Sequence, residues 1–255
     1  MQAMSRSAWL TIDIGNSALK AGLFLGDQLI QTSNLQAIEE VSELIATWNS
    51  KTPFERIGLC SVVPQNSELV ISKIRQFGNV PIFEMNSHST LPLQVRYTPP
   101  ESLGADRLAA ACSAWHPGGI SQIIIDAGTA ITIDVVSADG VFMGGVIMPG
   151  PSLTRRALAD YTANLPKVSL HSPNGVIGSS TAEAIQHGLI NGLIDGVLGI
   201  VSRIRESLDS SPVITLTGGW HQLLADKIPG VQLNRDLVLH GIKLLMQLNT
   251  ESSKS

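Results

Sequence analysis

One short stretch of sequence occurs twice, as TIDIGNS in Thr11–Ser17 and as IIDAGTA in Ile124–Ala130. Each copy is a β-branched apolar run that is followed by Asp, an apolar residue and Gly. An apolar segment follows each copy, at 19–25 and at 131–136, and ends in turn residues before a third apolar segment. Apolar segments joined by such short turns predict β-hairpins. Two similar units of strands and turns indicate a duplicated lobe.

The two Asp-x-Gly turns predict a site for a metal-bound polyphosphate. A turn that holds phosphates uses backbone N–H groups and hydroxyls at a glycine, where no Cβ blocks the approach. The residues that offer such groups are Gly15, Asn16, Ser17 and Lys20 in the first copy and Gly128, Thr129 and Thr132 in the second. Asp13 and Asp126 add hard oxygen ligands of the kind that Mg²⁺ or a monovalent cation prefers. Nucleotide chemistry is therefore the leading hypothesis.

Other nucleotide-binding motifs are absent from the sequence. A single Asp-x-Gly after a strand is more often an ordinary tight turn, so one copy alone predicts little. Neither copy contains G-x-G-x-x-G, and no G-x-x-x-x-G-K-[ST] occurs in the chain. The signatures of dinucleotide-binding folds and of P-loop proteins are thus excluded. The duplication is what favours a phosphate site over two ordinary turns.

Composition and charge restrict the class of protein. The 255 residues carry a formal net charge of -4, and the basic residues form no stripe, so neither nucleic acid nor a membrane surface is an expected partner. Cys60 and Cys112 are the only cysteines, which is too few for a secreted disulfide framework. The start of the chain lacks the apolar core of a signal peptide, and Asn191 and Asp195 interrupt the most apolar late stretch. A cytoplasmic protein without a membrane span is expected.

Strand and helix patterns alternate along the chain, which predicts an α/β fold. We expect an N-terminal lobe at 8–103 and a C-terminal lobe at 104–248, linked by a loop rich in Pro, Ser and Thr. The polar residues 249–255 are expected to form a disordered tail. The patterns predict helices near 38–48, 64–77, 104–115, from Trp220 and at 237–248, and buried strands at 57–63, 80–85 and 211–216.

A further candidate site is the tetrapeptide GADR, Gly104–Arg107, which lies just before a predicted helix of small residues. Asp and Arg at a helix start are commonly a cap with a solvated partner. This tetrapeptide, however, lies outside both repeated units, at the point in the chain where the two lobes are expected to meet. Asp106 can accept a hydroxyl proton there, and Arg107 can bind an anionic group through two N–H groups.

The order of these motifs resembles that of the type III pantothenate kinase family. The segments that carry the resemblance are Asp13–Ser17, Tyr97–Pro100, Gly104–Arg107, Asp126–Thr132, Gly144–Gly150, Ile177–Ile185 and Thr217–Gly219. The resemblance covers most of the chain, from Trp9 onward, and the ordered set is specific where a single motif is not. Ser17 keeps the hydroxyl of the Thr that is commoner at its position in the family, whereas Leu19 stands where Thr is frequent.

The resemblance implies a fold of duplicated ribonuclease H-like lobes, as in actin-like ATPases and sugar kinases, with the active site in the interlobe cleft. It implies phosphorylation of pantothenate by ATP to 4′-phosphopantothenate, the first step of coenzyme A biosynthesis. It also implies Mg²⁺ bound with the ATP, a required monovalent cation (K⁺ or NH₄⁺) and a homodimer.

The resemblance also assigns roles to residues by position. Asp106 would be the general base on the pantothenate hydroxyl, while Asp13 would ligate Mg²⁺ and Asp126 the monovalent cation. The residues that would bind ATP are Asp13, Ile14, Gly15, Asn16, Ser17, Ala18, Leu19, Lys20 and Thr129. Those that would bind pantothenate are Tyr97, Gly104, Ala105, Asp106, Arg107 and Thr181.

Two other functions remain open on the sequence. A kinase of the same fold group could act on a sugar or another small alcohol, because a fold does not choose a substrate. A regulatory protein could keep the nucleotide site and lose the chemistry, although the retention of Asp13, Asp106 and Asp126 argues against that outcome.

Three glycines, Gly188, Gly192 and Gly196, recur at four-residue spacing on a predicted helix. Such a stripe permits another helix to approach closely. Tight packing within the core is the ordinary explanation, and an interface between two copies of the chain is the sharper hypothesis.

Overall fold

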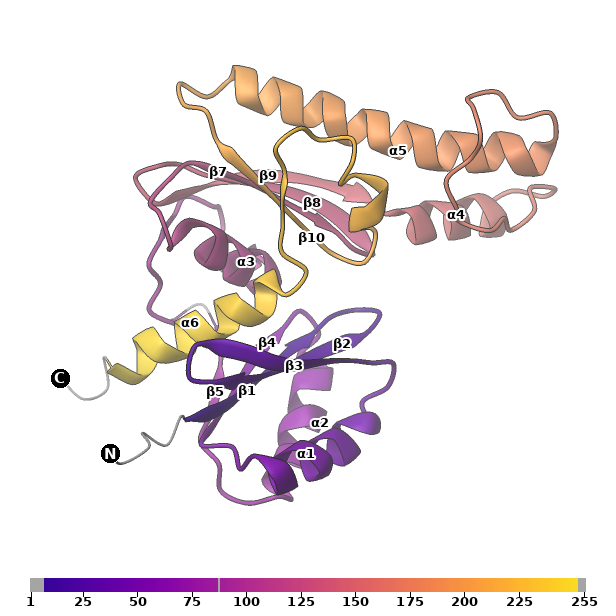
Figure 1. The fold of residues 1–255 in the computed structure, drawn as a ribbon. Helices are drawn as coiled ribbons and strands as arrows, with labels where there is room; N and C mark the ends of the chain where they lie inside the picture. Colours follow the sequence, from indigo (N-terminus) through magenta and orange to yellow (C-terminus); the bar gives the residue numbers. More distant parts are fainter. Residues whose placement is uncertain (1–6, 87, 252–255) are drawn as a thin grey trace. The chain divides into compact units, whose positions relative to one another are not determined.

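The structure, a computed structural model, describes residues 7–86 and 88–251, and the chain forms two compact units. The first unit contains the chain up to residue 117 and again from residue 236 onward. The second unit contains residues 118–235. Each unit is built on one twisted sheet with helices packed on it (Figure 1).

The sheet of the first unit has the strand order β3-β2-β1-β4-β5. The strands are β1 (Ala8–Ile14), β2 (Leu19–Leu25), β3 (Gln28–Leu35), β4 (Arg56–Ser61) and β5 (Ile82–Glu84). β1, β2 and β3 are antiparallel neighbours, whereas β4 runs parallel to β1 and β5 runs parallel to β4. The predicted hairpin of the first copy is therefore confirmed.

Helices cover both faces of this first sheet (Figure 1). α1 (Glu40–Lys51) and α2 (Pro64–Arg75) lie on one face, and α3 (Ala105–Trp115) and α6 (Leu237–Glu251) lie on the other. α6 crosses α3 closely, because a Cβ at Gly241 would overlap the backbone of Ala109. Two short elements, β6 (Gln94–Val95) and a 3-10 turn at Pro100–Ser102, lie in the loop before α3.

The second unit repeats the strand order of the first. Its strands are β7 (Gln122–Ala127), β8 (Ala130–Val136), β9 (Val141–Pro149), β10 (Val213–Thr217) and β11 (Gln232–Leu233). Within residues 118–235 the strand order is β11-β10-β7-β8-β9, so the unit's first strand again lies between its second and its fourth. The antiparallel β7, β8 and β9 and the parallel β10 and β11 repeat the directions found in the first unit. The duplication predicted from the two short motifs is thus confirmed at the level of whole sheets.

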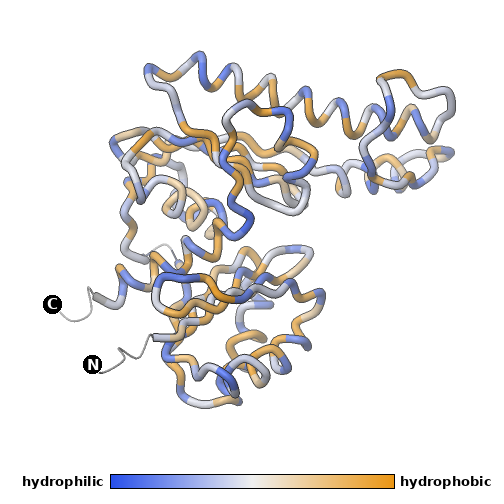
Figure 2. Tube along the Cα trace, in the orientation of Figure 1, coloured by the Kyte–Doolittle hydropathy of each residue, from blue (hydrophilic) through white to orange (hydrophobic). Residues whose placement is uncertain are grey.

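Apolar residues of the strands form a separate core in each unit. Ile12, Leu59 and Val70 belong to the first core, and Ile125, Ile133 and Leu216 belong to the second. Figure 2 shows apolar residues concentrated along the strands of both sheets. Two helices complete the second unit, α4 (Pro151–Asp160) and α5 (Thr181–Glu206).

The division of the chain differs from the expected boundary between 103 and 104. α3 and α6 belong to the first unit, because α3 packs along α6, and α6 packs on β1, β2 and β4. These contacts join residues that are far apart in the sequence, and no local pattern predicts them.

Two other sequence-based predictions are corrected by the structure. The tail predicted at 249–255 begins too early, since α6 continues to Glu251; residues 252–255 lie outside the described part of the chain. The Asn249 side chain accepts a hydrogen bond from Thr90 N (2.7 Å) and donates one to Thr90 O (3.0 Å), which anchors this last turn. The helix predicted from Trp220 is only a 3-10 turn, His221–Leu223.

α5 is the one helix within 7–86 and 88–251 that is long and apolar enough to cross a membrane, judged by length and composition alone. Asn191 and Asp195 lie within this helix and do not exclude it by that criterion. Leu193, Val197 and Val201 of α5 are nevertheless buried in the core of the second unit. This burial is the behaviour of a core helix in a globular protein.

Candidate active site

The first repeated motif forms the turn between β1 and β2, at residues 15–18. Gly15 N donates to Ala18 O (3.1 Å), which closes the turn. A Cβ on residue 15 would lie only 3.1 Å from the same oxygen, so glycine fits this place best. The side chains of Asn16 and Ser17 are exposed, as the phosphate interpretation requires.

Two residues that were predicted to bind ATP are core residues. Ile14 and Leu19 face each other across the start of the hairpin, and both side chains are buried in the first core. Only their backbone is therefore left for a ligand. The Leu at position 19 is thus explained by packing, because its side chain fills the core beneath the turn.

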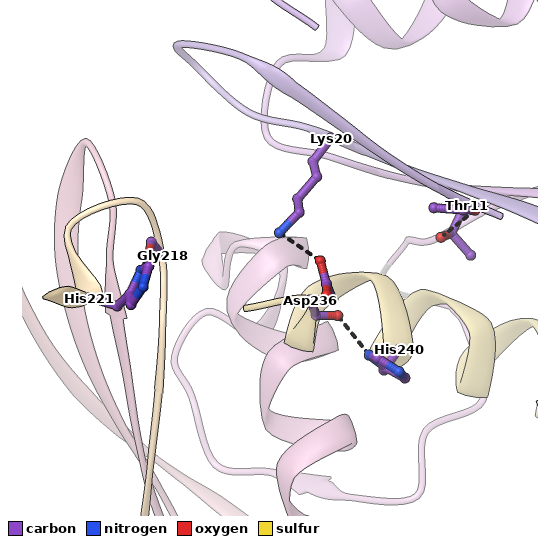
Figure 3. Close-up of polar contacts among 7 residues, drawn as sticks. Thr11, Lys20, Gly218, His221, Asp236 and His240 are labelled. Atoms are coloured by element: carbon purple, nitrogen blue, oxygen red, sulfur yellow. Dashed lines mark hydrogen bonds and ion pairs between the residues drawn. The ribbon is translucent and has the colours of Figure 1, made fainter. Parts of the chain in front are cut away.

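The polar side chains of the hairpin share one face of the sheet. Asp13 lies opposite Lys20 in the antiparallel pair of β1 and β2, and residues directly opposite each other project to the same side. The Lys20 ammonium forms an ion pair with Asp236, with 2.9 Å between Nζ and Oδ1 (Figure 3). Asp236 immediately precedes α6, which covers this face.

Asp106 lies in the first turn of α3, where its carboxylate folds back onto the helix start. Oδ1 accepts a hydrogen bond from the backbone N of Arg107 (2.8 Å). A Cβ on residue 104 would stand 2.6 Å from that oxygen, so Gly104 leaves room for the carboxylate to take this position. The glycine of the GADR motif is therefore explained by the space that the Asp106 carboxylate needs.

Asp13 lies beside a buried thiol, that of Cys60 on β4. Asp13 and Cys60 are paired in register across β1 and β4. Burial raises the pKa of Cys60 well above its ordinary value, and the charges of Asp13 and Asp106 raise it further. Asp13 thus lies at the carboxyl ends of two parallel strands, a common location of ligand sites in α/β sheets.

Arg107 and Tyr97 form a second pair beside Asp106. Arg107 is buried, and its Nη1 donates to the Tyr97 hydroxyl (3.3 Å). The guanidinium carbon also lies over the Tyr97 ring, 5.4 Å from its centroid. Two residues predicted to bind the substrate are therefore in contact, and Arg has further N–H donors that suit a planar anion.

The second repeated motif forms a tighter turn at residues 128–129, where Gly128 N donates to Ala130 O (3.0 Å). Asp126 lies opposite Thr132 in this hairpin, so a hydroxyl residue occupies the position that Lys20 holds in the first copy. Gly150 packs directly on the turn, and its N donates to Thr129 O (3.0 Å). A Cβ on residue 150 would overlap that carbonyl.

The loop after β10 closes over the Asp126 carboxylate. Gly218 has a positive φ of 89°, and a Cβ there would overlap Asp126 Oδ1 and the backbone of Ala127. Trp220 N donates to Ala127 O (2.8 Å), and His221 Nδ1 lies 2.8 Å from Gly218 O (Figure 3). The Thr217–Gly219 motif is therefore fixed against the second hairpin.

Sequence comparison assigns the chain to a family. The family model for type III pantothenate kinase matches residues 9–203. The type III pantothenate kinase of Acidothermus cellulolyticus is 35% identical over 251 residues, with 94% of this chain and 98% of that protein covered. The type III pantothenate kinase of Chlorobaculum parvum is 32% identical over 255 residues, with 94% and 95% covered. The chain belongs to the type III pantothenate kinase family.

The fold comparison agrees with the duplicated sheets. A Campylobacter jejuni structure that is named for the Baf family of transcriptional activators covers 95% of this chain and 99% of its own, with a TM-score of 0.61 and 22% identity. At that identity the likeness establishes the fold alone. The predicted fold of two ribonuclease H-like, actin-like lobes is confirmed, and the transcriptional role in that name is not carried over.

Thr181 is the first residue of α5 in this pantothenate kinase, and its exposed side chain lines a groove. Ser180 caps the helix by accepting from Glu183 N (3.2 Å), and the Glu183 carboxylate accepts from Ser179 N and Oγ. The hydrogen bonds from Ser179 lower the pKa of Glu183. The cap fixes where Thr181 stands, while its contact with pantothenate stays a prediction.

No cluster of three or more His, Cys, Asp or Glu side chains that could hold a metal ion occurs in the part of the chain that the structure describes. A metal that arrives with ATP does not need such a cluster, because Mg²⁺ is usually bound by one or two carboxylates together with phosphates and water. Asp13, a single carboxylate beside the phosphate turn, fits that requirement. At Asp126, one carboxylate among glycine turns fits a weakly held monovalent cation that takes further oxygens from backbone carbonyls and water.

Two positions in this region were not singled out from the sequence. Asp236 pairs with Lys20, and Cys60 lies on β4 in register with Asp13. Asp236 has the local signature of a helix start, because it precedes the apolar run of α6. Its partner on β2 is more than 200 residues away in the chain and leaves no mark in the sequence around Asp236.

Proposed function

We propose that this protein transfers the γ-phosphoryl group of ATP to pantothenate and so forms 4′-phosphopantothenate, the first step of coenzyme A biosynthesis. Membership of the type III pantothenate kinase family supports this reaction and this substrate. The residue assignments are supported by the register of Asp13 with Lys20 and Cys60 and by the Asp106 carboxylate held at the start of α3. A metal ligand, an acceptor for a proton and an anion-binding Arg107 are then gathered in one unit.

In the proposed step the primary hydroxyl oxygen of pantothenate attacks the γ-phosphorus. The bond from that phosphorus to the β–γ bridging oxygen breaks, and ADP leaves with the electron pair. Asp106 takes the hydroxyl proton on Oδ2, because Oδ1 accepts the backbone N–H of Arg107. The backbone bond and the missing Cβ at Gly104 keep the carboxylate in one orientation, which general base catalysis requires.

The first hairpin would neutralise and align the phosphates. Phosphoryl transfer depends on positioning and on charge stabilisation more than on covalent help from the protein. Asp13 would hold the Mg²⁺ that enters with ATP, Lys20 would donate to phosphate oxygens, and the turn at 15–18 would offer backbone N–H groups and the Ser17 hydroxyl. The Arg107–Tyr97 pair would hold the carboxylate of pantothenate.

The second hairpin would bind the monovalent cation and a further part of ATP. Asp126 would be the charged ligand for K⁺ or NH₄⁺, and Thr129 would contact the nucleotide. The close packing of Gly218 on Asp126 supports this assignment, since it places the carboxylate against the backbone of the loop, and the residue opposite Asp126 in the hairpin is Thr132.

We also propose a homodimer in which α5 contributes to the interface. An apolar groove of about 560 Å³, lined by Leu158, Ile185, Gly188 and Gly192 among others, lies along α4 and α5. No atom lies within 4 Å of a Cβ placed at Gly188 or Gly192, so these two glycines do not serve packing within the unit. Tyr161, which follows α4 in the sequence, and Ile177, which precedes α5, are 89% and 91% exposed and add apolar surface.

The dimer interface can be tested by filling the groove. Gly192→Leu should give the mass of a monomer by light scattering, because the added side chain occupies the groove while Leu favours a helix. Gly199→Leu is the matched control on the same helix, also in open space but outside the groove, and should keep the mass of a dimer. An unchanged mass for Gly192→Leu would remove this interface.

The cytoplasm is the proposed location. Cys60 and Cys112 are both free and buried, which fits a reducing compartment. Cell fractionation tests this location directly. The protein should be recovered in the cytoplasmic fraction, and recovery from an oxidising compartment would contradict the proposal.

A substrate panel tests the activity itself. Purified protein should convert pantothenate to 4′-phosphopantothenate in MgATP and K⁺, as followed by mass spectrometry and by coupled ADP release. Sugars and other small alcohols should give no product above the rate of ATP hydrolysis. Turnover of a sugar in place of pantothenate would favour a sugar kinase, and the absence of any product would favour a regulatory protein.

A further inference from the structure

The face of β2 that carries Lys20 is covered by the first turns of α6. Lys20, Gly22 and Phe24 alternate along the strand and so project to one side. A Cβ on residue 22 would stand 2.9 Å from Leu239 Cδ1, and Phe24 packs edge-on against His240 with 5.3 Å between the ring centroids. The start of α6 therefore rests directly on the strand that follows the phosphate turn.

Asp236 is fixed in this arrangement through both its side chain and its backbone. Its carboxylate pairs with Lys20 at 2.9 Å, and its carbonyl oxygen lies 2.9 Å from His240 Nδ1 (Figure 3). The His240 ring in turn packs on Phe24, from the same strand as Lys20. Asp236 is thus a rigid anchor for an otherwise flexible lysine.

The Lys20–Asp236 pair lies within reach of a ligand. The two side chains are 27% and 29% exposed, so solvent reaches both charges. An ammonium has three N–H donors, so an ion pair with Asp236 is compatible with a bond from the same ammonium to phosphate. A lysine that is held in place beforehand also loses less conformational freedom when the ligand binds.

We propose that Asp236 is a positioning residue that holds the Lys20 ammonium for the polyphosphate of ATP. This inference rests on the proposed function, in which Lys20 contacts phosphate. The arrangement follows the physical logic of the protein kinases, where a phosphate-binding Lys works only when its ion pair with a Glu on a helix is in place. Here the carboxylate comes from the residue that starts α6.

The opposite effect is also physically conceivable, because a carboxylate repels phosphate and competes for the ammonium. The two alternatives predict opposite signs. If Asp236 positions Lys20, its neutralisation weakens ATP binding; if Asp236 competes with phosphate, its neutralisation strengthens ATP binding. The rigid support of Asp236 by His240 and Phe24 favours positioning, since a competitor has to move away.

The test is a double-mutant cycle read by calorimetric binding of a non-hydrolysable ATP analogue with Mg²⁺. Asp236→Asn keeps a good helix cap and should raise the dissociation constant about tenfold. Lys20→Met should raise it by at least as much. In the Lys20→Met background, Asp236→Asn should add almost nothing, because Asp236 acts through the ammonium. The KM for ATP should rise in parallel while the KM for pantothenate stays constant, and Asp236→Glu should restore part of the affinity.

A second ion pair on the same helix provides the matched control. Lys243 Nζ lies 2.9 Å from Asp27 Oδ1, so this pair also joins α6 to the hairpin sheet, but at the β2–β3 turn. Asp27→Asn should lower the melting temperature and leave the dissociation constant of the ATP analogue unchanged. A general effect of loosening α6 would instead weaken ATP binding in Asp27→Asn as well, and would overturn the proposal.

The remaining outcomes separate the inference from the proposed function. Tighter or unchanged binding in Asp236→Asn, or an equal loss in both backgrounds, contradicts the positioning role while the kinase assignment stands. Wild-type affinity in Lys20→Met removes the phosphate role of Lys20, and the positioning role with it. A wild-type protein that does not bind the ATP analogue contradicts the proposed function itself.

Discussion

The two copies of the repeated hairpin differ in the residue that lies opposite the shared Asp. In the first unit Asp13 faces Lys20, and in the second unit Asp126 faces Thr132. The turns differ too, because the first spans residues 15–18 and the second only residues 128–129. The same backbone position therefore has a lysine opposite it in one copy and a threonine in the other.

Under the proposed assignment, this difference lets one duplicated element serve two purposes. A lysine opposite Asp13 would suit the binding of a polyphosphate that brings its own Mg²⁺. A lysine opposite Asp126 would instead compete with a monovalent cation for the carboxylate, and a threonine would not.

The largest expected effect concerns a residue that belongs to neither hairpin. Asp106→Asn removes the proposed base while keeping the shape of the side chain, so kcat should fall about 10³-fold. Binding of the non-hydrolysable ATP analogue should stay at the wild-type level. A loss of less than tenfold in kcat would contradict Asp106 as the base. One of the two hairpin carboxylates, Asp13 or Asp126, would then be the candidate base.

A smaller effect is expected from the loop that closes over Asp126. Gly218→Ala places a Cβ onto the Asp126 carboxylate at a positive φ, which should cost about 1–3 kcal/mol of unfolding free energy. The concentration of K⁺ that gives half-maximal activity should rise in this variant. Denaturant titrations and K⁺ titrations measure the two quantities.

The neighbouring residue is the control for that change. A Cβ on Gly219 would meet no atom within 4 Å, so Gly219→Ala should leave both the unfolding free energy and the K⁺ requirement unchanged. A Gly218→Ala variant that is destabilised but keeps the wild-type K⁺ requirement would separate the loop from the cation site.

The sequence predicted what depends on neighbouring residues. Both hairpins, the helix after Gly104 and the α/β class follow from local patterns of apolar residues, turns and caps. The place of α6 did not follow, because Gly241 and Leu239 pack against α3 and β2, which are distant in the chain. Asp236 could not be predicted as the partner of Lys20, nor Cys60 as the neighbour of Asp13, because the members of each pair are distant in the chain.

The smallest expected effect concerns the pH dependence of stability in the first unit. The hydrogen bond and ion pair with Lys243 lower the pKa of Asp27 below its ordinary value of 3.8. The stabilisation from this pair is therefore complete above pH 3.8 and is lost as the pH falls through the lower pKa of the folded protein. Lys243 itself is only 8% exposed and lies over the Trp9 ring.

Asp27→Asn should abolish this part of the acid dependence. The variant should melt about 3 °C lower at neutral pH, and its deficit should shrink as both proteins are acidified below pH 3.8. Melting curves across this range measure the difference. A deficit that stays constant with pH would mean that the charge of Asp27 does not contribute.

The division of labour between the hairpins is tested most directly by titrating Mg²⁺ and K⁺ separately in Asp13→Asn and Asp126→Asn. The account predicts that Asp13→Asn raises the Mg²⁺ concentration needed for half-maximal turnover and leaves the K⁺ requirement at the wild-type value. It predicts the reverse for Asp126→Asn. Variants that both shift the two requirements alike would contradict it, because the two carboxylates would then serve one common ion site.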